Sequence, residues 1–300
     1  MPISLGLGLL LPDLAAFMRP AILPTVFFML SVLMTRINLD EALLQIRSPI
    51  VPLIGLIWTV VAVPIIFALV LWLLAEGFNI TFSAGLVLAF MLWASSPPIF
   101  SSAPLSYIMR LDGTLSVGFL MAAIALHPIV TPLFVALFTD GAVSVPPIEL
   151  AIRLTMLIGG AAAVAFVVRK IIGKQRLNEY GSAMDGLNVI ALIVFAIAIM
   201  DGIGARLLEN PVLAASLIAF AFGAGAILHV ITSALFWRYG KRRALTIGLS
   251  THARNIAMAV GAMGAAVPPD TWLFFAMIQF PIYILPAILH PVYNRILPQR

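Results

Sequence analysis

Residues 250–255 read Ser-Thr-His-Ala-Arg-Asn and lie inside an otherwise apolar stretch that runs from 243 to 266. A second apolar stretch, from 81 to 109, is interrupted by Ala-Ser-Ser-Pro-Pro at 94–98. Proline has no backbone N–H and clashes with the preceding helical turn, so this second stretch is not expected to be one regular helix. At membrane depth, polar side chains and irregular backbone are tolerated only inside protein or beside a wet cavity. The two stretches therefore predict two broken membrane helices that face the protein interior.

The composition is that of an integral membrane protein. Of 300 residues, 62% are hydrophobic and 10% are charged, whereas soluble domains average about a quarter charged residues. Nine apolar runs follow one another, at 21–35, 49–74, 81–109, 114–138, 148–172, 184–206, 211–235, 243–266 and 271–294. The segment from Ile3 to Phe17 is interrupted by Pro12 and Asp13, which predicts a shortened crossing or an interfacial helix. We therefore expect an all-α polytopic protein with nine or ten transmembrane helices.

The basic residues define the orientation. One set of alternate connections contains 13 of the 17 Lys and Arg residues: Arg36, Arg47, Arg110, Arg169, Lys170, Lys174, Arg176, Arg238, Lys241, Arg242, Arg243, Arg295 and Arg300. Cytoplasmic connections of membrane proteins collect Lys and Arg. We therefore expect a multi-pass protein of the cell (inner) membrane with its C-terminus in the cytoplasm.

Composition also limits the chemistry. The chain has no Cys, which excludes disulfides, thiolate metal sites and Fe–S clusters. The net charge of +5 comes from basic residues in the short connections between apolar runs. Such residues mark the orientation of a membrane protein, so we expect no nucleic-acid partner. No nucleophile-and-base spacing, phosphate loop or metal motif is present, and we expect neither an enzyme nor a bound cofactor. The expected partners are the lipid bilayer and a small molecule.

The two broken stretches occupy matching positions in two halves of the chain. With the partial first segment counted, they are the fourth and ninth of ten, and this spacing of five is expected of two inverted five-helix repeats. We place the first repeat at about residues 1–140 and the second at about 145–297, in one domain over 1–300. Broken helices at such positions are a sequence indicator of a transporter's central site.

Arg254 is the most informative single residue. A charge at the centre of a membrane helix costs about 2.5–3.5 kcal/mol even on lenient insertion scales, so something must offset it. The guanidinium could bind an anionic substrate or replace an ion, or it could cap carbonyls of the broken helix or pair with Asp201. His252 could carry a coupling proton or donate one hydrogen bond. Asn255 and Ser250 could supply oxygen ligands or cap a helix.

Hydroxyl groups surround the other break, at Ser95, Ser96, Ser101, Ser102, Ser106 and Tyr107. They could coordinate a hard cation such as Na⁺, or they could simply allow close helix packing. For substrate binding the candidates are Arg254, Asn255, His252, Ser101 and Ser102. For ion binding they are Ser102, Ser116, Thr59, Ser250 and Thr251. His127 and His229 are expected to make interhelical hydrogen bonds, with a role as proton carrier as the alternative.

The segment from Ser96 to Ser116 contains several residues at spacings that match, in order, a pattern known from a family of membrane proteins. It resembles the fourth-helix pattern C-P-G-G-x-A-S-N-x-x-T-Y-L-A-R-G-D/N-x-x-L-S of the bile acid:sodium symporter family. The matching positions are Pro97, Ser102, Tyr107, Arg110, Asp112, Leu115 and Ser116. Pro64, Pro128, Thr131, Pro132 and His229 fit other helices of the family, and Arg254-Asn255 stands where the family has Gln-Asn. The resemblance implies a ten-helix secondary transporter with two inverted repeats, divided into a panel and a core bundle.

This sequence departs from the family at the sodium ligands that the resemblance implies. The fourth-helix Asn is Ala103, the fifth-helix Thr is Leu120, and the third-helix Gln is Thr59. The ninth-helix Glu is Ser250 or Gly248, depending on the alignment. A hard cation needs several oxygen ligands, so the sequence predicts weak Na⁺ binding.

The leading interpretation is a secondary transporter of a small organic anion that works by alternating access. Arg254 would replace the sodium ion electrostatically, with Na⁺ or H⁺ still open as a coupling ion and His252 as a candidate proton carrier. One alternative is a sodium symporter with rebuilt ligands, namely backbone carbonyls with Ser102, Ser116 and Thr59. Another is a membrane sensor or scaffold that transports nothing.

Overall fold

The structure, a computed structural model, describes residues 2–37, 50–139 and 145–297. Every regular element in these ranges is a helix. Seven helices there are long and apolar enough to cross a membrane: Pro12–Arg36, Ile50–Phe78, Gly113–Phe138, Pro147–Ile172, Gly181–Ala198, Pro211–Tyr239 and Pro269–Ile296. The expectation of an all-α, multi-pass membrane protein is confirmed at this level.

The N-terminal region forms two short helices before the first long one. Helix α1 (Pro2–Leu10) is followed by α2 (Pro12–Met18), a 3₁₀ turn η1 (Arg19–Ala21) and α3 (Ile22–Arg36). At about 1.5 Å per residue, α1 is too short to cross a bilayer. The segment from Ile3 to Phe17 is thus divided, and its second part extends the run expected at 21–35. Pro12 and Pro20 lie in the first turns of α2 and η1, where a missing N–H costs no hydrogen bond.

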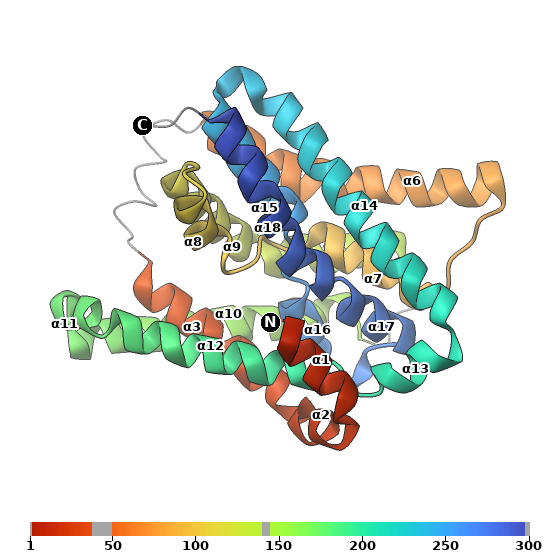
Figure 1. The fold of residues 1–300 in the computed structure, drawn as a ribbon, viewed down its shortest axis with the longest axis horizontal. Coiled ribbons are helices and arrows are strands. Elements are labelled where there is room, and N and C mark those ends of the chain that lie inside the picture. Colours follow the sequence, from red (N-terminus) through yellow and green to blue (C-terminus); the bar gives the residue numbers. More distant parts are fainter. Residues whose placement is uncertain (1, 38–49, 140–144, 298–300) are drawn as a thin grey trace.

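The next span contains a widened turn near its middle. It consists of α5 (Ile50–Ile57), a π-helical turn η3 (Trp58–Ala62) and α6 (Val63–Phe78). Pro64 lies two residues after the π turn, in the first turn of α6, and its missing N–H is consistent with a local change in the hydrogen-bond pattern. Asn79, with φ +53°, ends α6 in the left-handed conformation that commonly stops a helix. In Figure 1, α6 extends away from the other helices.

Both predicted broken helices are broken in the structure. The first consists of α7 (Ala84–Ser95) and α8 (Ser102–Ile108), and the second of α15 (Lys241–His252) and α16 (Ala257–Met263) with the 3₁₀ turn η5 (Gly264–Ala266). Helix α7 is buried over nearly all of its length, as expected of a helix that is apolar on every side.

The remaining helices surround these breaks. They are α9 (Gly113–Phe138), α10 (Pro147–Ile172), α11 (Lys174–Glu179), α12 (Gly181–Ala198), α13 (Ile203–Glu209), α14 (Pro211–Phe236) with the 3₁₀ turn η4 (Trp237–Tyr239), α17 (Pro269–Met277) and α18 (Gln279–Ile296). The run expected at 184–206 is divided, because α12 ends at Ala198 and α13 begins at Ile203. Gly202, with φ +70°, allows that turn, since residues with a Cβ rarely adopt this conformation.

The helices pack as two groups (Figure 1). In the first group, α3 lies against α10 and α12, and α12 also contacts α1 and α2. In the second group, α14 runs along α15, while α7 contacts α6, α9 and α17. Helix α10 joins the groups through α9 and α16. The second group has an aromatic core, in which the ring centroid of Phe90 lies 4.8 Å from Phe220 and 5.0 Å from Phe274.

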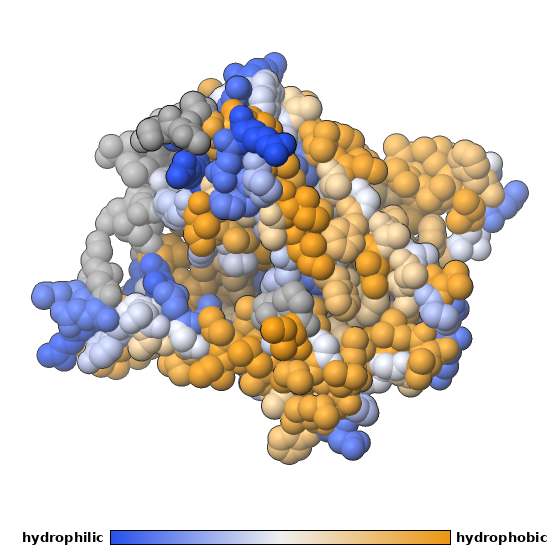
Figure 2. Space-filling model, viewed as in Figure 1, coloured by the Kyte–Doolittle hydropathy of each residue, from blue (hydrophilic) through white to orange (hydrophobic). Residues whose placement is uncertain are grey.

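The outer surface is suited to lipid. Large apolar side chains such as Trp72, Leu137 and Ile227 are more than half exposed on long helices. Figure 2 shows hydrophobic residues over most of the visible face, with hydrophilic residues gathered at the ends of the helices. Soluble proteins rarely expose continuous apolar surface on this scale.

Candidate functional site

The two helix breaks meet inside the protein and bond to each other. The backbone N–H of Ile99 donates to Ala253 O at 2.9 Å, and that of Asn255 donates to Pro97 O at 2.7 Å. Pro98 and Arg254 form an isolated antiparallel bridge between these bonds. Two segments far apart in sequence thus supply hydrogen bonds that broken helices lose, which buried backbone requires. We call this meeting point the crossing, residues 96–101 and 253–256.

Local sequence explains why α7 ends at the crossing. Ser96 precedes a proline, which disfavours the helical conformation, and it is extended with φ −70° and ψ 152°. The two prolines that follow supply no N–H groups. The hydroxyl of Ser95 donates to Met91 O at 2.7 Å, and that of Ser96 donates to Leu92 O at 2.6 Å. These hydroxyls satisfy carbonyls in the last turn of α7.

Arg254 is fully buried at the crossing and donates to four backbone carbonyls. Nε donates to Thr251 O at 2.7 Å. Nη1 donates to Ala94 O at 2.5 Å and to Ser96 O at 3.1 Å. Nη2 donates to Thr59 O, in the π turn, at 3.0 Å. Four of the five N–H groups of a guanidinium are therefore engaged.

The electrostatic partners of Arg254 are helix ends. Helices α7 and α15 both finish beside it, and the C-terminal end of a helix carries partial negative charge. Among the described residues no acidic side chain pairs with Arg254. Asp201, the alternative partner considered from the sequence, instead accepts from Arg19 at 2.7 Å. Hydrogen bonds to a charged group contribute about 1.5–3 kcal/mol each, so four of them can offset the cost of burying this charge.

A cavity of about 550 Å³ lies between the crossing and the first helix group. On one side it is lined by residues of α3 and α12, and on the other by parts of the crossing, α8 and α18. Arg36 and Asp185, an exposed ion pair, line it at the C-terminal end of α3 and the beginning of α12. Its boundary is mainly apolar, with polar side chains near the crossing.

The structure brings three of the five predicted substrate residues to this cavity. Arg254, Asn255 and Ser101 line it. Asn255 is 8% exposed, and its amide has no hydrogen-bond partner among the described residues. His252 and Ser102 are not part of the lining, although both are buried next to the crossing.

The cavity also contains polar residues that the sequence analysis missed: Arg36, Asp185, Asn188, Gln279 and Tyr283. Gln279 is 4% exposed and uses its Nε2 to donate to Phe275 O at 3.0 Å. A buried amide in the apolar run at 271–294 was the available signal. Arg36, Asp185 and Asn188 lie near the ends of apolar runs, where polar residues are ordinary. Tyr283 lies in the same run as Gln279, but a tyrosine in an apolar helix is a weaker signal than an amide.

The five residues predicted to bind an ion fall into two sets. The hydroxyls of Thr59 and Thr251 lie 3.0 Å apart. Thr251 donates to Ile247 O at 2.7 Å, so Thr59 is the donor between the two threonines. The hydroxyls of the other three residues, Ser102, Ser116 and Ser250, are buried without a partner among the described residues. They belong to α8, α9 and α15, which contact one another.

His229 and His127 each have a hydrogen-bonding partner. His229 Nε2 lies 3.1 Å from Tyr293 Oη, which links α14 to α18 and confirms the expected interhelical bond. His127 Nδ1 lies 2.7 Å from Thr131 Oγ1 in the same helix. Thr131 in turn donates to Ser95 O at 3.1 Å, so the link from α9 to α7 runs through the threonine.

The end of the molecule opposite Arg36 is held by a separate set of contacts. Arg19 and Arg36 lie toward opposite ends of the span Pro12–Arg36. The guanidinium of Arg19 lies 4.7 Å from the ring centroid of Trp272. Trp272 Nε1 donates to Asp201 O at 3.0 Å, and Arg153 Nη1 donates to Ala262 O at 2.9 Å. These contacts join the two helix groups at this end.

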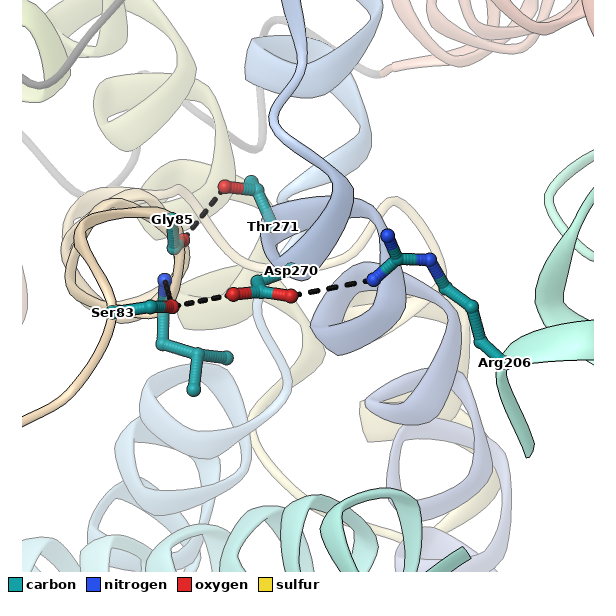
Figure 3. Close-up of polar contacts among 6 residues, drawn as sticks. Ser83, Gly85, Arg206, Asp270 and Thr271 are labelled. Carbon is teal, nitrogen blue, oxygen red and sulfur yellow. Dashed lines mark hydrogen bonds and ion pairs between the residues drawn. The ribbon is translucent and has the colours of Figure 1, made fainter. Parts of the chain in front are cut away.

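Further contacts at the same end hold the second group together. Asp270 accepts from Ser83 at 2.5 Å and pairs with Arg206 at 3.3 Å (Figure 3). The neighbouring hydroxyl of Thr271 donates to Gly85 O at 2.7 Å. The start of α7, the start of α17 and α13 are therefore tied together at this end.

No protein-family model matches the chain, and no curated protein is significantly similar to it.

Proposed function

We propose that the protein is a secondary transporter that moves a small organic anion across the membrane by alternating access, without the usual sodium sites. The observation that carries the proposal is the buried guanidinium of Arg254, bonded to four carbonyls where two broken helices meet. The resemblance to the bile acid:sodium symporter family supports the same assignment.

The carbonyl partners of Arg254 support the proposal that it replaces a coupling cation. In transporters with discontinuous helices, unwound carbonyls and the C-terminal ends of half-helices coordinate Na⁺. Here carbonyls of just this kind, at Ala94, Ser96 and Thr251, accept from a guanidinium. A cation tethered to the chain does not dissociate, so we expect the site to be assembled without dissolved sodium.

The arrangement of helices supports two inverted repeats and two bundles. In each half of the chain a broken helix precedes a final long helical segment, α7–α8 before α9 and α15–α16 before α17–α18. We assign α1–α3, α10 and α12 to the panel. We assign α5–α9 and α14–α18 to the core. Alternating access would then be movement of one bundle against the other around the crossing.

The lining of the cavity favours a substrate that has an anionic group and an apolar body. Its volume of about 550 Å³ is in the range of small-molecule sites. Positive charge from Arg254 and the free amide of Asn255 lie at the crossing end, and apolar side chains of α3 and α12 line much of the rest. We place the anionic group near Asn255 and Ser101.

On the predicted orientation, we assign this conformation to the inward-facing state. Arg36 belongs to the set of basic residues expected in the cytoplasm, and it lines the cavity. The contacts of Arg19, Trp272 and Asp201 close the opposite end.

Uptake into proteoliposomes from a panel of radiolabelled organic acids tests this proposal. We expect at least one organic anion to accumulate above protein-free vesicles, and Asn255→Ala to lower that uptake more than Trp72→Ala, an exposed control on α6. Failure of every acid to accumulate, together with no thermal stabilisation by any of them, would favour a sensor or scaffold instead.

A sodium symporter with rebuilt ligands is the second candidate. The observation that favours it is the set of three buried hydroxyls without partners, at Ser102, Ser116 and Ser250. Buried polar groups are normally bonded, and a bound cation would satisfy these. Saturable thermal stabilisation by Na⁺ but not K⁺, lost in Ser102→Ala, would support this candidate.

A further inference from the structure

A second cavity, of about 560 Å³, lies away from the crossing at the predicted cytoplasmic end. One wall comes from the connection between α8 and α9, where Tyr107 and residues 111–114 line it. The other wall contains every residue from Tyr239 to Arg243, at the beginning of α15. We call it the basic pocket. The transport site proposed above does not use it.

The basic pocket carries excess positive charge. Among the described residues that line it, Lys241, Arg242 and Arg243 face a single acid, Asp112. Asp112 is already engaged, since one oxygen accepts from the backbone N–H of Leu115 at 3.0 Å and the other pairs with Arg243 at 3.6 Å. Lys241 and Arg242 have no acidic partner among the described residues. Two uncompensated cations therefore remain at the pocket.

The surrounding fold does not offset the positive charge at the basic pocket. The three cations occupy consecutive positions in the first turn of α15, where the positive end of the helix dipole disfavours cationic side chains. Lys241 Nζ lies 5.9 Å from the ring centroid of Trp237, a contact worth little at an exposed site. An anionic group in the pocket would offset charges that the protein leaves uncompensated.

The surroundings indicate an anion that belongs to a lipid. The membrane span Pro211–Tyr239 ends at the pocket, and Trp237 is 41% exposed there, as aromatic residues at a membrane interface are. Ile108, next to the lining residue Tyr107, is 67% exposed. Inorganic phosphate could contact only the cations. A phospholipid could contact the cations through its headgroup and the exposed apolar side chains through its acyl chains.

We propose that the basic pocket binds the headgroup of an anionic phospholipid of the cytoplasmic leaflet, with Lys241 and Arg242 contacting its phosphate. Anionic lipids are abundant in that leaflet, and basic pockets between membrane helices bind their headgroups. Tyr107 lines both this pocket and the cavity at the crossing. A bound lipid would therefore contact a residue that also borders the cavity at the crossing.

Native mass spectrometry of the purified protein, with phosphatidylglycerol and phosphatidylcholine added in equal amounts, tests the proposal. We expect preferential retention of phosphatidylglycerol. The variant Lys241→Gln/Arg242→Gln should bind it about 25-fold more weakly, since each cation near the membrane surface contributes about a fivefold factor. The control Lys170→Gln/Arg176→Gln removes the same charge at the same predicted side, outside the pocket, and should bind like wild type.

Two further measurements do not depend on the variants. Selective binding of phosphatidylglycerol by the wild-type protein should weaken as NaCl is raised, because salt screens exposed charges. Inorganic phosphate at millimolar concentration should not displace the lipid. Equal retention of both lipids, equal loss in the two double variants, or complete displacement by phosphate would each overturn the proposal.

Discussion

Arg254 shows how one residue can be costly and still hold a structure together. Its guanidinium connects the ends of α7 and α15 with the π turn η3 between α5 and α6, through bonds of 2.5–3.1 Å. A lysine has three donors on a single nitrogen, and it cannot copy the planar spread of a guanidinium. The residue is therefore specified by geometry as well as by charge.

Replacing Arg254 with Met should lower the stability of the protein markedly. Four buried carbonyls would lose their donor, and an unsatisfied buried group costs about 1–3 kcal/mol, so we expect a total loss of about 3 kcal/mol or more. Arg254→Lys should fall between Met and wild type. Thermal unfolding in detergent measures both, with Arg176→Met, an exposed arginine, as the control. A melting temperature equal to wild type in Arg254→Met would contradict the assigned bonds.

At the scale of elements, the half-helices α7 and α15 both end at the crossing. The sequence was sufficient to predict both interruptions, because proline and polar residues are costly inside membrane helices. It was not sufficient to predict that Pro97 and Asn255 bond to each other, since antiparallel pairing of distant segments leaves no local pattern. The π turn that presents Thr59 O was also missed, because Trp58–Ala62 lie inside a long apolar run and nothing in their order specifies a widened turn.

The contact between α1 and α12 offers a test with its control in the same helix. A Cβ built on Gly8 would lie 2.7 Å from Ile197 O and 2.8 Å from Met200 Cβ, whereas one on Gly6 would meet nothing within 4 Å. We expect Gly8→Ala to destabilise the protein by about 1–3 kcal/mol through overpacking. Gly6→Ala should be neutral or stabilising by up to about 1 kcal/mol, because alanine favours helix. Equal melting temperatures for the two variants would show that α1 does not pack as described.

At the scale of the whole molecule, the two ends differ. The cavity at the crossing is bordered by Arg36 at one end, while Arg19, Trp272 and Asp201 join the helix groups at the other. From the sequence, the helical class, the order of the apolar segments and the two helix breaks could be predicted, whereas the orientation stays a prediction. The contacts between the helix groups at the Arg19 end could not be predicted, because no spacing in the sequence encodes the approach of Arg19 to Trp272.

The absence of native cysteine makes accessibility measurements clean. In Ser101→Cys, a membrane-impermeant maleimide should label the cavity from the predicted cytoplasmic side only. Adding Trp272→Ala should raise labelling from the opposite side several-fold, because it removes the aromatic contact with Arg19 and the bond to Asp201. Adding Trp72→Ala, a change on exposed α6, should not. Unchanged labelling in the Trp272→Ala background would exclude these contacts as the closure.

The most direct test of the central claim is uptake of the best transported organic acid with Na⁺ present or replaced by choline. If Arg254 stands in for the coupling cation, wild-type uptake should be the same within about twofold in both media, and Arg254→Gln should lose uptake in choline. Strict dependence of the wild type on Na⁺, or normal uptake by Arg254→Gln in choline, would contradict the account.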